Sequence, residues 1–195
     1  MSPALRVWIR WTLGVLVGAF VVLLVTGLWL VWNYRPIAVA WSAIVDGPDW
    51  VRHVALMRFT HRGAASVLTM AALALLVEGV LLVRRSGRGR LVTPAIPTAV
   101  LAVVGGISGS VLAWDQVALR AVTAAENGTG FRLLHSPLVR EWRVDGRAFS
   151  ADAMPRWFWS HTVVVPLVLA ALLVVVTVRV RRARPAVPSP GPTPG

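Results

Sequence analysis

The feature that most constrains this chain is the uncharged stretch from Trp11 to Trp32, which follows Arg6 and Arg10. As a helix, its twenty-two residues cover roughly 33 Å, enough to cross the hydrocarbon core of a bilayer. A secretory signal peptide would have a shorter apolar region and a small-residue cleavage site, whereas this stretch leads into the aromatic anchor Trp29–Tyr34. We therefore expect a retained membrane span.

Three further apolar stretches follow, at about 64–83, 93–114 and 159–178. Hydrophobic residues make up 56% of the chain and charged residues 14%, so it holds more apolar side chains than the core of one soluble domain would bury. The sequence predicts an all-α membrane protein, a four-transmembrane-helix bundle over residues 1–182. Pro166 is expected to kink the last span, and the proline-rich tail 183–195 is expected to be disordered.

The arginines predict the orientation of the bundle. Those at the N-terminus, after the second span and at the C-terminus have Glu78 as their only nearby acid, whereas the two opposite connections carry the other seven acids. We therefore expect both termini in the cytoplasm and the chain in the inner or plasma membrane. Short amphipathic helices are expected near 116–125 and 137–142. Because the arginines flank apolar spans, the net charge of +12 indicates lipid contact and not nucleic-acid binding.

Two histidines lie at the mouths of spans that run in the same direction. His61 precedes the second span by about one turn, and His161 begins the fourth. Alternating spans therefore bring both imidazoles to a similar depth near the outer face. One interpretation is a haem held between them, six-coordinate and suited to electron transfer but not to oxygen binding. The alternative is that both are ordinary interfacial residues at helix ends.

Four residues favour the haem interpretation. Arg58 and Arg62 could pair with haem propionates, and Gly27 and Gly109 would let backbone stand close to a flat ring. The ordinary alternatives are headgroup contact for the arginines and small-residue helix packing for the glycines. With no cysteine in the chain, thiolate ligation and covalent c-type attachment are excluded.

The chain resembles the four-helix N-terminal half of cytochrome b, and cytochrome b6 most of all. The matching segments are Thr26-Gly27 with Asn33–Pro36, Leu56–Arg62 with Ala65-Ser66, Gly109–Gln116 with Ala121–Thr123, Ser136–Val139, and Arg156–Pro166. The resemblance implies that His61 and His161 ligate the haem nearer the outer face. It also implies that Arg58 contacts a propionate and that Gly27 and Gly109 pack on that haem. His53 and His135 match no ligand position.

The chain departs from the family at its second haem. The family carries further histidines about fourteen residues after each of these two, on the same helix faces and about 21 Å deeper. Here those positions are Leu75 and Val175 or Val176, and Leu13 and Ala95 replace glycines of the inner haem. The resemblance therefore implies a single non-covalent haem b.

These observations favour an electron-transfer subunit of a quinol-linked respiratory complex, with other redox subunits as partners. The family's Pro-Glu-Trp-Tyr loop is absent, so we expect no complete active site in this chain. A haem-free scaffold descended from a cytochrome b is the alternative, whereas a self-contained transmembrane reductase would need an inner cofactor. Glu78 replaces an arginine of the chloroplast form; pairing with Arg84 or Arg85 is expected, and proton handling is the alternative.

Overall fold

The computed structural model describes residues 3–33, 50–87, 89, 91–112 and 154–182, and every regular element in these ranges is helical. The predicted short helices near 116–125 and 137–142 and the tail 183–195 lie outside the described residues. The elements are α1 (Pro3–Asn33), α3 (Trp50–Ser86), α4 (Val92–Val111), α7 (Met154–Trp159), the π-helical turn η3 (Ser160–Val164) and α8 (Val165–Arg182). The last three follow one another directly and form the fourth long segment.

Four helical ranges, 4–32, 53–85, 92–110 and 155–182, are long and apolar enough to cross a membrane. The expected all-α, four-helix membrane bundle is therefore confirmed, and the chain is a multi-pass membrane protein. Helix α3 begins at Trp50, fourteen residues before the apolar stretch, so His61 lies well inside a helix. A helix satisfies its own backbone groups and can continue from the hydrocarbon into the polar headgroup region.

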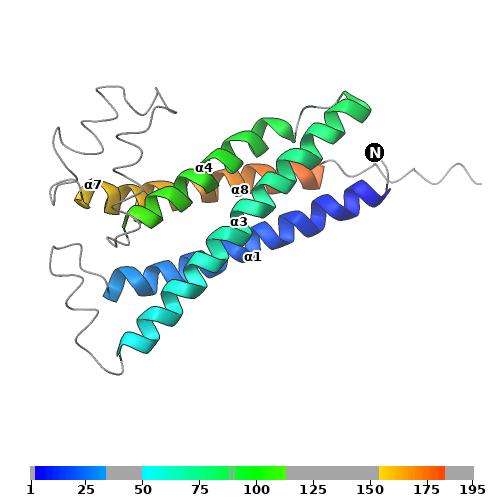
Figure 1. Ribbon diagram of the computed structural model, residues 1–195. Coiled ribbons are helices and arrows are strands. Elements are labelled where there is room, and N and C mark those ends of the chain that lie inside the picture. Colours follow the sequence, from blue (N-terminus) through cyan, green and yellow to red (C-terminus); the bar gives the residue numbers. More distant parts are fainter. Residues whose placement is uncertain (1–2, 34–49, 88, 90, 113–153, 183–195) are drawn as a thin grey trace, which may run out of the picture.

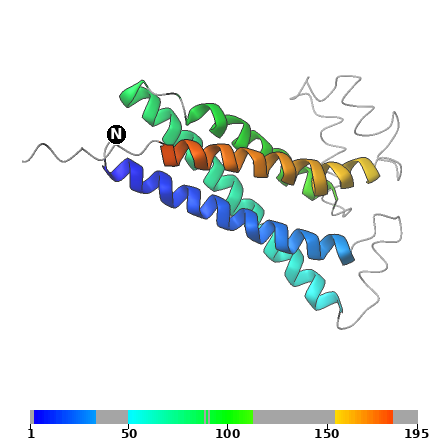
Figure 2. The same ribbon diagram turned by 180° about the vertical axis from the view of Figure 1, so that it is seen from behind.

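The helices pack in chain order, α1 against α3, α3 against α4 and α4 against α8, with a smaller contact between α1 and α8. Figures 1 and 2 show the start of α1, the turn between α3 and α4 and the end of α8 at one end of the bundle, called here the turn end. The other end, where α3 and α7 begin, is called the histidine end. Alternation along the chain makes α3 and α8 parallel, as the position of the two histidines requires.

The turn end is fixed by a glycine. Gly87 has φ 66° and donates its N–H to the carbonyl of Val83 at 2.8 Å, which closes the last turn of α3. Glycine adopts this left-handed conformation without the steric cost that a Cβ would add. The chain then enters α4 within a few residues, so α3 and α4 become close antiparallel neighbours.

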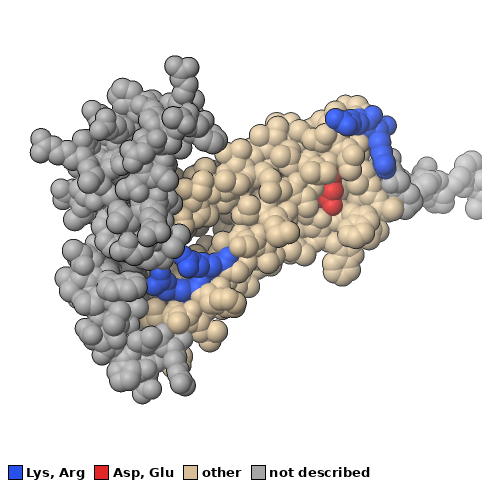
Figure 3. Space-filling model, in the orientation of Figure 1, with Lys and Arg blue, Asp and Glu red and all other residues tan. Residues whose placement is uncertain are grey.

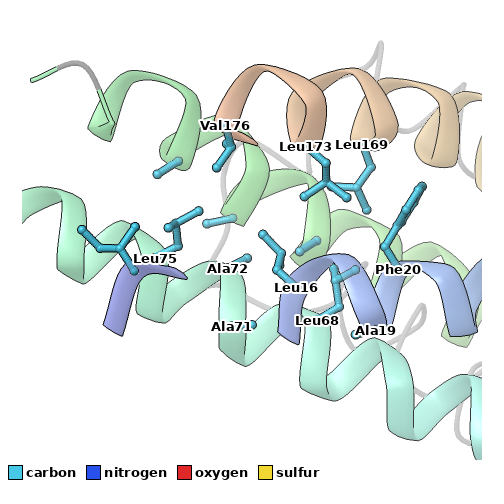
Figure 4. Close-up of a cluster of buried hydrophobic side chains, with 14 of the residues drawn as sticks. Leu16, Ala19, Phe20, Leu68, Ala71, Ala72, Leu75, Leu169, Leu173 and Val176 are labelled. Carbon is cyan, nitrogen blue, oxygen red and sulfur yellow. The ribbon is translucent and has the colours of Figure 1, made fainter. Parts of the chain in front are cut away.

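Hydrophobic side chains, almost all of them aliphatic, fill the interior from mid-bundle to the turn end. Figure 4 shows a close-up of this cluster, including Phe20. Leu16, Leu75 and Val176 have no exposed surface, and they come from α1, α3 and α8. Small residues such as Ala72 and Ala95, also fully buried, let α3 and α4 approach closely. The four helices therefore meet in a close-packed apolar core in this half of the bundle.

Candidate functional site

The two predicted histidines face each other at the histidine end. His61 lies on α3 and His161 on η3, and their ring centroids are 6.2 Å apart with an angle of 71° between the ring planes. The sequence places them 100 residues apart, so only the packing of the helices brings them together. Both side chains are partly buried. The structure therefore brings the two imidazoles close together inside the bundle.

The hydroxyl of Thr26 fixes the proton on the His61 ring. Thr26 Oγ1 lies 2.9 Å from His61 Nδ1 and 2.7 Å from the carbonyl oxygen of Val22. A hydroxyl has one proton, and the carbonyl can only accept it, so Thr26 donates to Val22 and must accept from the histidine. His61 therefore carries its proton on Nδ1, which leaves the lone pair on Nε2.

The same arrangement recurs on the opposite helix pair. Ser108 Oγ lies 3.0 Å from the carbonyl oxygen of Gly105, to which it donates, and 2.9 Å from His161 Nδ1, from which it accepts. The Nε2 atom of His161 is thus also left with its lone pair. Hydroxyl acceptors behind both rings therefore hold the two imidazoles in the same tautomer, one that leaves Nε2 free to bind a metal. Sequence reasoning included Thr26 in a motif but gave neither hydroxyl a role.

Two glycines make room for the imidazoles themselves. A Cβ on Gly109 would lie 2.8 Å from His161 Cε1 and 3.2 Å from its Nε2, and one on Gly27 would lie 3.2 Å from His61 Cε1. At the first of these distances the His161 ring would have to move. The sequence predicted that these glycines pack on a haem, and the structure shows them beside the two histidine rings.

A π-helical turn carries His161. Val165 donates its N–H to the carbonyl of Ser160, five residues back, where an α-helix would bond four residues back. Pro166 follows directly and has no N–H to give to Thr162. The wider turn adds one residue before the proline and so changes the direction in which His161 leaves the helix. The kink expected at Pro166 takes the form of this turn.

The predicted cationic residues lie on the same helix as His61. Arg58 is one turn earlier and partly buried, and Arg62 is the next residue and exposed. Figure 3 shows arginine surface toward the histidine end of the bundle, separate from a second arginine group at the turn end. His53, also on α3, is exposed, and His135 lies outside the described residues.

The donor set fits a metal that brings ligands of its own. Among the described residues there is no group of three or more His, Cys, Asp or Glu side chains that could hold a metal ion. Two imidazoles are too few for a zinc site. Two metal–nitrogen bonds of about 2 Å, together with the radii of two five-membered rings, add up to about 6 Å. The observed centroid separation therefore suits an iron atom whose four other ligands come from a macrocycle.

The turn end offers no second set of donors. Leu75 and Val176, two of the positions that the resemblance assigns to further histidines, are fully buried in the apolar core, whereas Val175, the alternative to Val176, is exposed. Ala95 is also fully buried, and Leu13 packs against this core. In the described part of the bundle, the volume that a second macrocycle would need is therefore occupied by aliphatic side chains.

Comparisons with known proteins identify the family of the chain. The family described as cytochrome b/b6/petB matches residues 1–183. Cytochrome b6 of Gloeobacter violaceus is 27% identical over 87% of this chain and 80% of its own length. Cytochrome b6 of Synechococcus elongatus is 27% identical over 87% and 80%, and that of Synechococcus sp. strain WH7803 is 28% identical over 87% and 78%.

Proposed function

The chain belongs to the cytochrome b/b6 family of membrane electron-transfer proteins, and we propose that it carries a single haem b between His61 and His161. The observation that carries this proposal is the hydroxyl oxygen that lies 2.9 Å from Nδ1 of each ring. Each has its Nδ1 proton held by a hydroxyl, so each can present a free Nε2 lone pair to iron. Their 6.2 Å separation supports coordination from opposite faces of one macrocycle.

Four further residues support the site in this proposal. Gly27 and Gly109 leave room for the imidazoles, and Arg58 and Arg62 supply positive charge for the carboxylates at the edge of a haem. A haem held by His61 and His161 would supply one-electron chemistry. Because two protein nitrogens would hold its iron, we expect electron transfer without oxygen binding.

A single haem at one end restricts the direction of electron transfer. The close-packed turn end supports the absence of a second haem on the way across the membrane. We propose that electrons pass between this haem and quinol or a redox protein on the same side, within a larger respiratory complex. The chain then acts as an electron-transfer subunit, and other subunits complete the active site.

The arginine distribution supports an orientation in which the turn end and both termini face the cytoplasm. Single cysteines at Ser86 and at Asn127 test this with a membrane-impermeant thiol reagent on intact cells. We expect Asn127→Cys to be labelled and Ser86→Cys to be protected. The reverse pattern would overturn the orientation.

The experiment that tests the proposed function is haem quantified per chain in the purified protein, together with its reduced absorption spectrum. We expect one haem per chain and a low-spin bis-imidazole spectrum. A folded but colourless protein would support the scaffold alternative, and two haems per chain would contradict the single-site proposal.

A further inference from the structure

Glu78 is the one acidic residue in the described part of the chain, and it lies within the membrane-crossing range of α3. It is seventeen residues beyond His61 on the same helix, about 26 Å toward the turn end. Acidic residues inside membrane helices are rare and mark functional sites by default. This position is remote from the proposed haem, so an inference about it does not depend on that proposal.

Thr12 on α1 is the hydrogen-bond partner of Glu78. Its Oγ1 donates to Glu78 Oε1 at 2.8 Å. The other described threonines direct their hydroxyls to a backbone carbonyl four residues back, at Thr26, Thr60, Thr69, Thr93, Thr98, Thr162 and Thr177. Thr12 is the exception. This local bond is always available to a helical threonine, so its replacement marks Thr12 and Glu78 as a pair across the α1–α3 interface.

The second carboxyl oxygen has no partner. Glu78 Oε2 is buried and makes no hydrogen bond. The expected ion pair with Arg84 or Arg85 does not form, and Glu78 makes no ion pair with any other described residue. The neighbours one turn away on the two helices are apolar: Ile9, Leu16, Leu75 and Leu82. The carboxyl group therefore has one hydroxyl donor and no countercharge among the described residues.

This environment distinguishes between the two protonation states. A carboxylate is an acceptor with about four lone-pair sites and a full charge, and here it would receive one hydrogen bond in an apolar interface. A neutral carboxylic acid needs fewer hydrogen bonds and no countercharge. Its carbonyl oxygen accepts from Thr12, and its other oxygen carries a proton, so that only one neutral O–H is left without an acceptor. An unpaired neutral group costs far less to bury than an unpaired charge.

We propose that Thr12 and Glu78 form a proton-binding site in the membrane, with Glu78 held as a neutral carboxylic acid. Glu78 as a residue is partly exposed, and Figure 3 shows one acidic patch on the side of the bundle, surrounded by uncharged surface. A small apolar reagent dissolved in the bilayer can therefore approach Glu78 from its exposed side, although Oε2 itself is buried. The site takes a proton and, in the same state, should be open to covalent modification by an apolar carbodiimide.

The modification follows from the protonated state. The acid proton moves to a carbodiimide nitrogen, the carboxyl oxygen bonds to the central carbon, and the resulting O-acylisourea rearranges to a stable N-acylurea. The whole reagent is added, and no oxidant or second reactant is needed. An ionised carboxylate has no proton to give and does not start this sequence.

The test treats the full chain, in phosphatidylcholine vesicles at neutral pH, with dicyclohexylcarbodiimide, followed by peptide mapping. We expect one reagent mass on the peptide containing Glu78, and no adduct on that peptide after treatment with a water-soluble carbodiimide or in Glu78→Gln. If Glu78→Gln does not fold, the peptide map of the wild-type protein still shows whether the peptide containing Glu78 is modified. An unmodified Glu78 peptide would overturn the proposal.

Infrared spectroscopy gives a second readout of the same site. The wild-type spectrum minus that of Glu78→Gln should contain the C=O band of a protonated carboxyl, and Thr12→Val should move this band to higher frequency by removing its hydrogen bond. Carboxylate bands in the difference spectrum would overturn the neutral state. An unmoved band in Thr12→Val would exclude Thr12 as the partner.

Discussion

The two ends of the same four helices are built from different chemistry. At the histidine end, hydroxyls, glycines and a π-helical turn surround two imidazoles, whereas toward the turn end the equivalent faces of the same helices carry leucine, valine and alanine. The helical framework is common to both halves. Whether the bundle can hold a cofactor therefore depends on a few residues at one depth more than on the helical framework. Aliphatic side chains toward the turn end are enough to fill the space that a second cofactor would need.

The largest expected effect comes from removing a ligand at the histidine end. His61→Ala and His161→Ala should each abolish stable haem binding, because an iron with a single imidazole is five-coordinate and weakly held. The measurement is haem per chain with the optical spectrum. His53→Ala and His135→Ala are the matched controls and should retain haem. A low-spin bis-imidazole spectrum in either variant would show that the substituted histidine is not a haem ligand.

A smaller effect is expected from adding one methyl group to the same end. In Gly109→Ala the new Cβ would lie 2.8 Å from His161, so the ring must move. Overpacking of this kind typically costs about 1–3 kcal/mol. We expect the free energy of haem binding, measured by titration, to become less favourable by a similar amount. Gly106→Ala on the same helix is the control, because its Cβ would meet no atom within 4 Å. Equal losses in the two variants would contradict the packing argument.

The hydroxyls behind the rings should have an influence of at most similar size. Thr26→Val or Ser108→Ala removes the acceptor for an Nδ1–H, and losing such a partner typically costs at least about tenfold in metal affinity. The imidazole also becomes a poorer donor to ferric iron, so the midpoint potential should rise. Thr98→Val is the control toward the turn end, since this buried hydroxyl bonds only to the Pro94 carbonyl. A potential that does not change would contradict the tautomer assignment.

The smallest effect is expected when a single histidine is introduced into the apolar core toward the turn end. Leu75→His should not recruit a second haem, because Val176 supplies no partner nitrogen and the surrounding core is close-packed. The variant should still titrate with one haem per chain and one midpoint potential. Two resolved midpoints would show that the turn end is not closed.

The sequence predicts how deep a residue lies in the membrane better than it predicts the direction in which its side chain points. The helical rise of 1.5 Å per residue and the alternation of spans were enough to place His61 and His161 at one depth. The positions without donors, Leu75 and Val175 or Val176, followed only from the resemblance to the family. The rotation of each helix about its axis depends on packing against its neighbours. For that reason the hydroxyls of Thr26 and Ser108 could not be assigned to the rings in advance.

Two local features were also beyond sequence reasoning. Proline predicted a distortion near residue 166, but whether the backbone answers with a bend or a π-helical turn depends on the hydrogen bonds that the surrounding structure allows. Glu78 was expected to pair with a nearby arginine on its own helix. The structure pairs it with Thr12 on α1, a contact between residues 66 positions apart.

The aliphatic core toward the turn end has an electrical consequence. Moving one elementary charge through the whole membrane potential is worth about 2.3 kcal/mol per 100 mV. With the single haem that we propose at the histidine end, an electron passing through this chain would stay on one side of an insulating layer and cross little of that potential. Voltage across the membrane should then neither drive nor oppose its reaction, and any coupling to the potential must come from the subunits around it.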